Sequence, residues 1–154
     1  MQIFLASTTD DMDVARQLFR EYQEFLGEDL CFQGFEQELA SLPGKYASPE
    51  GAILLAKHEG DMIGCVAVRA LKGDTCEMKR LYVKTVSQGL SAGRKLAEAI
   101  IKKAKELGYK KMQLDTLERL ERAVELYEKL GFKEISSYYE NPLNKVIYLE
   151  LDLT

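Results

Sequence analysis

Positive charge gathers in one stretch of an otherwise acidic chain. The formal net charge is −4, yet residues 78–97 contain no acidic side chain and several basic ones: Lys79, Arg80, Lys84, Arg94 and Lys95. Within this stretch a loop with Gly89 and Gly93 joins a predicted strand to a long amphipathic helix. Backbone N–H groups at a helix N-terminus lack intrahelical partners, and the helix dipole adds positive charge there. The stretch therefore predicts a site for the phosphate groups of a small polyanion.

Two common phosphate-binding loops do not fit this sequence. A nucleoside-triphosphate loop requires a lysine followed by serine or threonine after its last glycine, whereas Gly93 is followed by Arg94 and Lys95. A dinucleotide-binding loop requires the pattern G-x-G-x-x-G. Only Gly89 and Gly93 are present here, four residues apart, although Asp115 lies at a suitable distance.

Five segments resemble the core of the GNAT superfamily of acyl-CoA-dependent N-acetyltransferases. They follow that superfamily's order and spacing: EMKRLYV (77–83), QGLSAG (88–93), LGYKKMQLDT (107–116), AVELYEKLGFKEI (123–135) and YYENP (138–142). The resemblance implies acetyl-CoA as the acyl donor. It also implies two groups of donor-binding residues, Leu81, Tyr82 and Val83 along the pantetheine arm, and Gln88, Gly89, Leu90, Ser91, Ala92, Gly93 and Arg94 around the pyrophosphate.

Two positions depart from the superfamily's pattern. Ser91 stands where a glycine is usual; serine is tolerated at negative φ and penalised at positive φ, and its hydroxyl could instead cap the helix. Leu120 stands where many members have an asparagine that contacts the cofactor arm. These departures favour an alternative to catalysis, a non-catalytic acyl-CoA-binding or regulatory module.

The resemblance also implies catalytic roles. Tyr127 would protonate the departing thiolate, although a tyrosine at such a position could equally pack in the core. Glu77 is the expected general base, because the acceptor amine must lose a proton. Glu77 could instead be a glutamate that faces solvent or pairs with a lysine. Asp115 is a lower-ranked candidate for the base. The acceptor is expected to be a primary amine of a small molecule or a protein, bound by residues 20–48 and 136–144, where Tyr138 and Tyr139 could line a pocket.

The hydrophobic pattern predicts the elements that position these residues. We expect a single α/β domain over residues 1–154, with a mixed, mostly antiparallel sheet of about six or seven strands flanked by about four helices. The expected strands are 1–6, 51–57, 62–71, 75–84, 111–116, 132–136 and 145–153. The expected helices run from 7–10 to Gly27 with Phe25 on the core face, from 34 to 42, from the loop to Leu107, and from 118 to 130.

The strand at 75–84 shows an irregular pattern. Cys76 and Met78 are apolar with a period of two, but the next apolar pair, Leu81 and Val83, is out of phase. Such a slip predicts a β-bulge, here near residues 79–80, since otherwise the second pair would face the wrong side. The resemblance implies that this strand then diverges from the next parallel strand and leaves a V-shaped gap for the donor.

Composition narrows the remaining possibilities. The 154 residues include no long apolar run and no basic, apolar leader, so we expect neither a membrane span nor a signal peptide. The negative net charge argues against nucleic-acid binding. Cys31, Cys65 and Cys76 lack metal-site spacing and predict buried, reduced thiols in a cytoplasmic protein. His58 is the single histidine and is expected at a surface turn, so we expect no metal site. Whether the protein forms a homodimer is left open.

Overall fold

The computed structural model describes residues 1–30, 33–143 and 145–154, which excludes Cys31. In this part of the chain, seven strands form one sheet in the order β1-β2-β3-β4-β5-β7-β6. Their bounds are β1 Gln2–Leu5, β2 Ala52–His58, β3 Asp61–Lys72, β4 Thr75–Val83, β5 Lys111–Leu117, β6 Lys133–Ile135 and β7 Val146–Asp152. Only β4 and β5 pair in parallel. The predicted mixed, mostly antiparallel sheet is confirmed.

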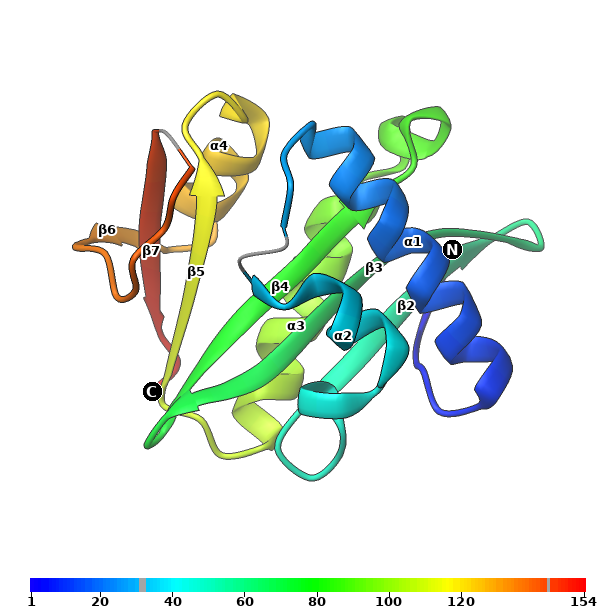
Figure 1. Ribbon diagram of the computed structural model, residues 1–154, viewed down its shortest axis with the longest axis horizontal. Coiled ribbons are helices and arrows are strands. Elements are labelled where there is room, and N and C mark those ends of the chain that lie inside the picture. Colours follow the sequence, from blue (N-terminus) through cyan, green and yellow to red (C-terminus); the bar gives the residue numbers. More distant parts are fainter. Residues whose placement is uncertain (31–32, 144) are drawn as a thin grey trace.

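Helices cover both faces of this sheet (Figure 1). The helices α1 (Thr9–Leu26) and α2 (Phe35–Ala40) pack on one face, together with the short 3-10 turn η2 (Gly44–Tyr46). The helices α3 (Ala92–Glu106) and α4 (Glu121–Lys129) pack on the other face. A second 3-10 turn, η3 (Thr85–Leu90), leads from β4 into α3. The two faces therefore bury two separate hydrophobic clusters.

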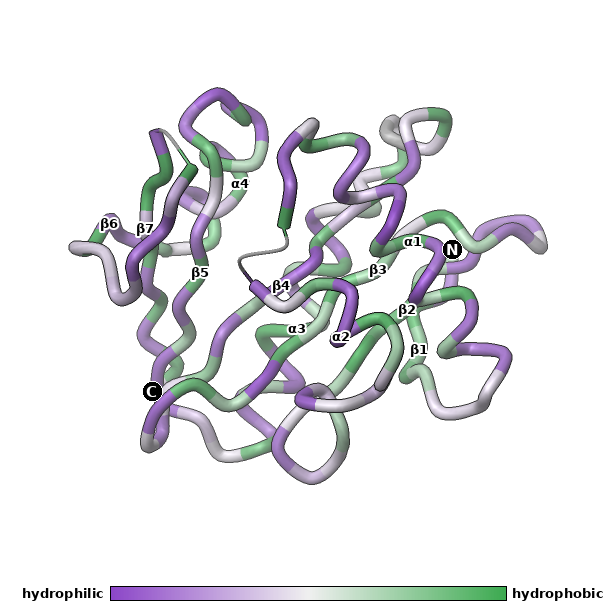
Figure 2. The backbone as a smooth tube through the Cα atoms, in the orientation of Figure 1, coloured by the Kyte–Doolittle hydropathy of each residue, from purple (hydrophilic) through white to green (hydrophobic). Residues whose placement is uncertain are grey.

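Local sequence signals determine where α1 begins and ends. The Thr8 hydroxyl accepts the Asp11 N–H at 3.0 Å and the Asp11 carboxylate accepts the Thr8 N–H at 3.2 Å, which forms a capping box. Gly27 ends the helix at a positive φ of 68°. Hydrophilic and hydrophobic residues alternate along α1 (Figure 2), but Phe25 is not on the core face, because 49% of its surface is exposed.

The predicted bulge is present in β4. Ala67 pairs with Lys79 and Cys65 pairs with Tyr82, so one residue of β3 faces two residues of β4. Arg80 sits at this irregularity with a φ of 62°, in the left-handed region that arginine rarely adopts. The bulge turns the far half of β4 away from its next neighbour.

As a result, β4 and β5 remain paired over only three residues each. Residues 75–77 pair with residues 111–113, whereas β5 continues to Leu117 and pairs with β7 along its whole length. Figure 1 shows the two strands converging at one end and diverging toward the other. The predicted V-shaped gap is therefore present, and within the described residues the β5-facing edge of β4 beyond Glu77 has no strand partner.

A buried ion pair holds the bulge in place. The Nε and Nη2 atoms of Arg80 each donate to the Glu38 carboxylate at 3.0 Å, and the guanidinium carbon lies 5.1 Å from the centroid of the Phe35 ring. Arg80 is only 3% exposed. The left-handed backbone of an arginine costs about 1–2 kcal/mol, and these contacts from α2 offset that cost.

The start of α4 differs from the expectation. We expected the helix from residue 118, but it begins at Glu121. The Glu118 N–H donates to the Lys145 carbonyl at 2.8 Å, and the Leu120 N–H donates to the Leu117 carbonyl at 3.0 Å. Because these bonds extend the sheet and form a turn, residues 118–120 bridge β5 and α4 instead of joining the helix.

We predict that Glu38→Gln lowers the free energy of unfolding by about 3 kcal/mol, because it leaves the buried guanidinium of Arg80 without its countercharge. Urea denaturation measures this change. The matched control is Glu36→Gln in the same helix. Glu36 pairs with Arg20 at 3.3 Å where both side chains are exposed, so this change costs less than about 1 kcal/mol. Equal, small effects of the two substitutions would show that the bulge does not depend on this pair.

Candidate active site

A cleft of about 590 Å³ opens where β4 and β5 diverge. We call it the long cleft. It is lined by the far half of β4, the start of α3, the segment that joins β5 to α4, and two aromatic side chains of α1. The residues of β4 and α3 are Leu81, Tyr82, Val83, Ser91, Gly93 and Arg94. Six of the ten predicted donor-binding residues therefore meet in one cavity.

The outer end of the long cleft is suited to an anion. The N-terminus of α3, a helix of 15 residues, points its free N–H groups and positive dipole end toward it. Arg94 lines this end, and Ala92 is buried beneath it. Gly89 and Leu90 lie in η3, as does the backbone of Gln88, whose side chain is outside the described part.

Sequence reasoning missed several residues of this cleft, among them Phe25, Arg119, Glu121 and Arg122. Arg119 and Arg122 line it from the β5–α4 segment, and Phe25 lines it from the end of α1. Arg119 also donates a hydrogen bond to the Leu26 carbonyl and so ties that segment to α1. The run ERLER at 118–122 has as many glutamates as arginines, so its composition gave no signal of a cationic wall, and only the fold shows that Arg119, Glu121 and Arg122 line the cleft.

Ser91 has a positive φ, the strained alternative for a serine at this position. Its φ is 57° and its ψ is 24°, and its side chain makes no capping hydrogen bond to α3. Of the alternatives for Ser91, the helix cap is therefore not the one that this structure adopts. A left-handed backbone is readily adopted by glycine and costs other residues free energy.

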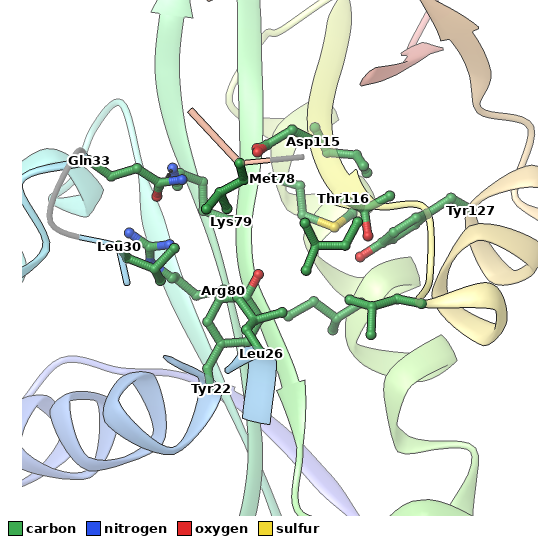
Figure 3. Close-up of a pocket in the computed structure, with 15 residues that line it drawn as sticks. Tyr22, Leu26, Leu30, Gln33, Met78, Lys79, Arg80, Asp115, Thr116 and Tyr127 are labelled. Carbon is green, nitrogen blue, oxygen red and sulfur yellow. Dashed lines mark hydrogen bonds between the residues drawn. The ribbon is translucent and has the colours of Figure 1, made fainter. Parts of the chain in front are cut away.

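At its inner end the long cleft meets a small cavity of about 40 Å³ between β4, β5 and α1. We call it the inner cavity. Six residues line both spaces: Tyr22, Leu81, Asp115, Thr116, Leu120 and Tyr127. Figure 3 shows Lys79 and Gln33 on one side of the inner cavity, and Asp115 and Tyr127 on the other. A group bound at this junction would touch both strands.

Tyr127 is a buried tyrosine at this junction. The residue is 7% exposed, its ring packs on Phe132 with centroids 5.6 Å apart, and its side chain points toward the cavity (Figure 3). Among the described residues, no group accepts its hydroxyl proton. Burial, followed by the charges of Tyr22 and Asp115, raises the pKa of Tyr127 above its ordinary value. The hydroxyl is therefore protonated at neutral pH.

The two candidate bases lie in different surroundings. Glu77 is 1% exposed; its Oε1 accepts from Arg69 at 2.9 Å and its Oε2 accepts from Tyr138 at 2.6 Å. Asp115 lines both the long cleft and the inner cavity, and its Oδ2 accepts from Tyr139 at 2.7 Å. Glu77 lines neither of these spaces. Asp115 is therefore the carboxylate that lies next to Leu81 and Tyr127.

Lys79 is a buried cation in the wall of the inner cavity. Its side chain is 10% exposed, and its ammonium donates to Gln33 Oε1 at 2.8 Å and lies 4.0 Å from Glu77 Oε1. Burial and then the charge of Arg80 lower the pKa of Lys79 to about 8, against the opposing effect of the nearby carboxylates. The ammonium is therefore the main form at pH 7, in a place where charge is costly.

The comparisons with known proteins agree with this geometry. The acetyltransferase (GNAT) family model matches residues 12–132. The chain belongs to this family. An uncharacterized N-acetyltransferase of Schizosaccharomyces pombe is 44% identical to it over 146 residues, which cover 94% of this chain and 90% of the relative. The protein is thus an N-acetyltransferase, and the predicted family membership is confirmed.

Solved structures of the family share its fold. A GNAT acetyltransferase from Staphylococcus aureus superposes with a TM-score of 0.80 at 19% identity and covers 99% of this chain and 100% of that one. A GNAT acetyltransferase from Elizabethkingia anophelis, with acetyl-CoA bound, has a TM-score of 0.57 at 27% identity and covers 67% of this chain and 76% of that one. The structure from Staphylococcus aureus supports the fold, and the structure from Elizabethkingia anophelis shows a family member with acetyl-CoA bound.

In residues 1–30, 33–143 and 145–154, no group of three or more histidine, cysteine or carboxylate side chains is arranged to hold a metal ion. No described helix has the length and apolar character needed to cross a membrane. His58 lies at the end of β2, 3.9 Å from the Glu59 carboxylate. Cys65 and Cys76 are buried free thiols.

We predict that Ser91→Gly raises the free energy of unfolding by about 1 kcal/mol, because glycine removes the strain of the left-handed backbone. The same substitution at Ser87, four residues earlier and without positive φ, should lower stability by about 0.5–1 kcal/mol through the entropy of the unfolded chain. Chemical denaturation of the two variants measures both changes. A loss of stability in Ser91→Gly would contradict the strained conformation.

Proposed function

We propose that this enzyme transfers an acetyl group from acetyl-CoA to a primary amine by direct attack, without a covalent enzyme intermediate. The observation that carries this proposal is the unpaired edge of β4, which lies opposite Tyr127 and leads to a cationic helix N-terminus. The bound acetyl-CoA in the 27% identical structure from Elizabethkingia anophelis supports the choice of donor.

The long cleft fits this donor in both chemistry and order. The backbone groups of Leu81, Tyr82 and Val83 that face the open side of β4, away from β3, would hydrogen-bond the amide groups of the pantetheine arm, as a neighbouring strand would. The N–H groups of residues 88–94, with Arg94 nearby, would hold the pyrophosphate. Arg119 and Arg122 line the opposite wall together with Glu121. Bound in this way, acetyl-CoA supplies an activated acetyl group at the inner end of the cleft.

The chain then contributes two proton transfers and one polarising contact. A backbone N–H near Leu81 polarises the thioester carbonyl, which makes its carbon more open to attack by the amine nitrogen. As the new C–N bond forms and the C–S bond breaks, the amine loses a proton to a carboxylate. Tyr127 donates its hydroxyl proton to the departing thiolate, a modest contribution of about 10²-fold in rate. The products are an N-acetylated amine and CoA.

We assign proton removal to Asp115 on geometric grounds. Asp115 lines the space that contains Leu81 and Tyr127, and only one of its oxygens, Oδ2, accepts a recorded hydrogen bond in the described part of the chain. Glu77 was the residue first expected in this role and stays a prediction. Both of its oxygens are engaged and it lies outside that space, so any proton would have to reach it through another group.

No observation favours the alternative of a non-catalytic module. Ser91 and Leu120, which suggested it, both line the long cleft without filling it. The choice between a small-molecule and a protein amine, the oligomeric state and the cytoplasmic location stay predictions.

We predict that Tyr127→Phe lowers kcat about 10²-fold and leaves the dissociation constant for acetyl-CoA unchanged, because the lost hydroxyl acts only as the thiolate leaves. Thiol release with the most active member of an amine panel gives kcat, and calorimetry gives the dissociation constant. Tyr109→Phe is the control, since the Tyr109 hydroxyl bonds to the Glu50 carbonyl far from the cleft. Wild-type turnover in Tyr127→Phe would refute the acid assignment.

The same assay separates the two bases. We predict that Asp115→Asn lowers kcat by about 10²-fold or more, because the amine proton then has no acceptor. Glu77→Gln should have the smaller effect on kcat. The reverse order of effects would assign the base to Glu77 instead.

A further inference from the structure

A second pocket extends the inner cavity on the α2 side of the sheet. It measures about 250 Å³, and we call it the side pocket. Lys79 and Gln33 line both the inner cavity and the side pocket, so the two spaces adjoin at these residues. The inner cavity has room for little more than an amine group, whereas the side pocket has room for the rest of a small molecule. An acceptor whose amine reaches Asp115 would therefore extend past Lys79.

The side pocket carries an excess of positive charge. Its cations are Lys45, Arg69 and Lys79, and its carboxylates are Glu38 and Glu77. The Glu38 carboxylate is already engaged by both donors of Arg80. Within this lining only Glu77 is left to balance Lys79 and Arg69, whose side chains are 10% and 23% exposed, and the same oxygen, Oε1, faces Arg69 at 2.9 Å and Lys79 at 4.0 Å. The lining of the side pocket therefore keeps an excess of positive charge, and the next carboxylate that faces Lys79 is Asp115, across the inner cavity.

Opposite charges also face each other across the inner cavity. Lys79 lies on β4 and Asp115 lies on β5, where the strands have diverged. Among the described residues, these two side chains form no ion pair with each other: Lys79 bonds to Gln33, and Asp115 accepts from Tyr139 and Asn141. A buried cation and a carboxylate held apart in this way are complementary to a ligand that carries both charges.

We propose that the acceptor is a small amine that also bears a carboxylate, such as an amino acid, with its amine beside Asp115 and its carboxylate bound by the Lys79 ammonium and the terminal nitrogens of Arg69, next to the Glu77 carboxylate that already lies between these two cations. This inference rests on the proposed function, and it names the class of acceptor for the same site. Arg69 uses its Nε for Glu77 and, among the described contacts, has no partner for its terminal nitrogens, which are suited to a second carboxylate. The carboxylate is unchanged in the reaction, while the amine exchanges a proton for the acetyl group.

The rest of such an acceptor would lie against tyrosines. Tyr138 and Tyr139 line the side pocket and donate their hydroxyl protons to Glu77 and Asp115, respectively. These bonds fix both rings, which also pack on each other and on Tyr148, with ring centroids 5.2–5.7 Å apart. Leu71 adds an apolar surface at the same wall. A side chain larger than that of alanine is therefore accommodated on the α2 side of the sheet.

The test compares proteinogenic amino acids with their decarboxylated amines. Each pair differs by the carboxylate, and its two amines are more similar in basicity than an amino acid and its amide would be. Thiol release at saturating acetyl-CoA gives kcat/KM for each compound. We expect at least one amino acid to be acetylated with a kcat/KM about tenfold to a hundredfold above that of its decarboxylated amine, the range of a hydrogen bond to a charged group.

Lys79→Met tests the residue itself. It should reduce the preference for the carboxylate to within about threefold, mainly through a higher KM, because the lysine holds the acceptor in both ground and transition states. Lys72→Met is the matched control: Lys72 is exposed at the end of the neighbouring strand β3, and its replacement should leave the preference unchanged. A thermal melt shows whether each variant is folded.

The outcomes separate this inference from the proposed function. Decarboxylated amines acetylated as well as or better than the amino acids would overturn the inference, and this comparison needs no variant. If the protein binds acetyl-CoA but acetylates no amino acid, the inference is also overturned, whereas the proposed donor site is not. A folded Lys79→Met that keeps the full preference would remove Lys79 from the proposal. Failure to bind acetyl-CoA at all would instead overturn the proposed function.

Discussion

The ion pair between Arg80 and Glu38 is the contact on which the site depends. It holds an arginine in a left-handed conformation at the centre of β4, and so it keeps one residue out of the strand pairing. Because of this bulge, β4 and β5 separate after three paired residues, and the edge of β4 is open where a neighbouring strand would lie. The cleft therefore results from the backbone conformation of β4, and α2 stabilises that conformation through the Glu38 contact with Arg80.

The same irregularity divides the two ends of the reaction. On one side of the bulge, Lys79 points toward α2 and the side pocket; on the other, Leu81 faces the long cleft. Asp115 and Tyr127 close the space between them from β5 and α4. Donor and acceptor would thus approach one point from two faces of a single strand. This arrangement explains why Lys79 is buried close to the donor-binding backbone, although burial of its charge costs free energy.

Much of this fold could be predicted from the sequence, because its signals are local. The phase slip between Met78 and Leu81 located the bulge, and glycines and capping residues located the helix ends. The choice between Glu77 and Asp115 could not be made in this way, since it depends on side chains from segments far away in the chain. Arg69 and Tyr138 occupy the oxygens of Glu77, and neither contact has a sequence pattern.

The most direct test of the central claim is amide hydrogen exchange of the protein with and without acetyl-CoA, followed by mass spectrometry. If the open edge of β4 holds the donor, saturating acetyl-CoA slows exchange in residues 81–83 and at the start of α3, because bonds to the ligand replace bonds to water. Residues 133–135 of β6, which are remote from the cleft, should exchange as before. Binding of acetyl-CoA that leaves residues 81–83 unchanged and protects another part of the chain would contradict the account.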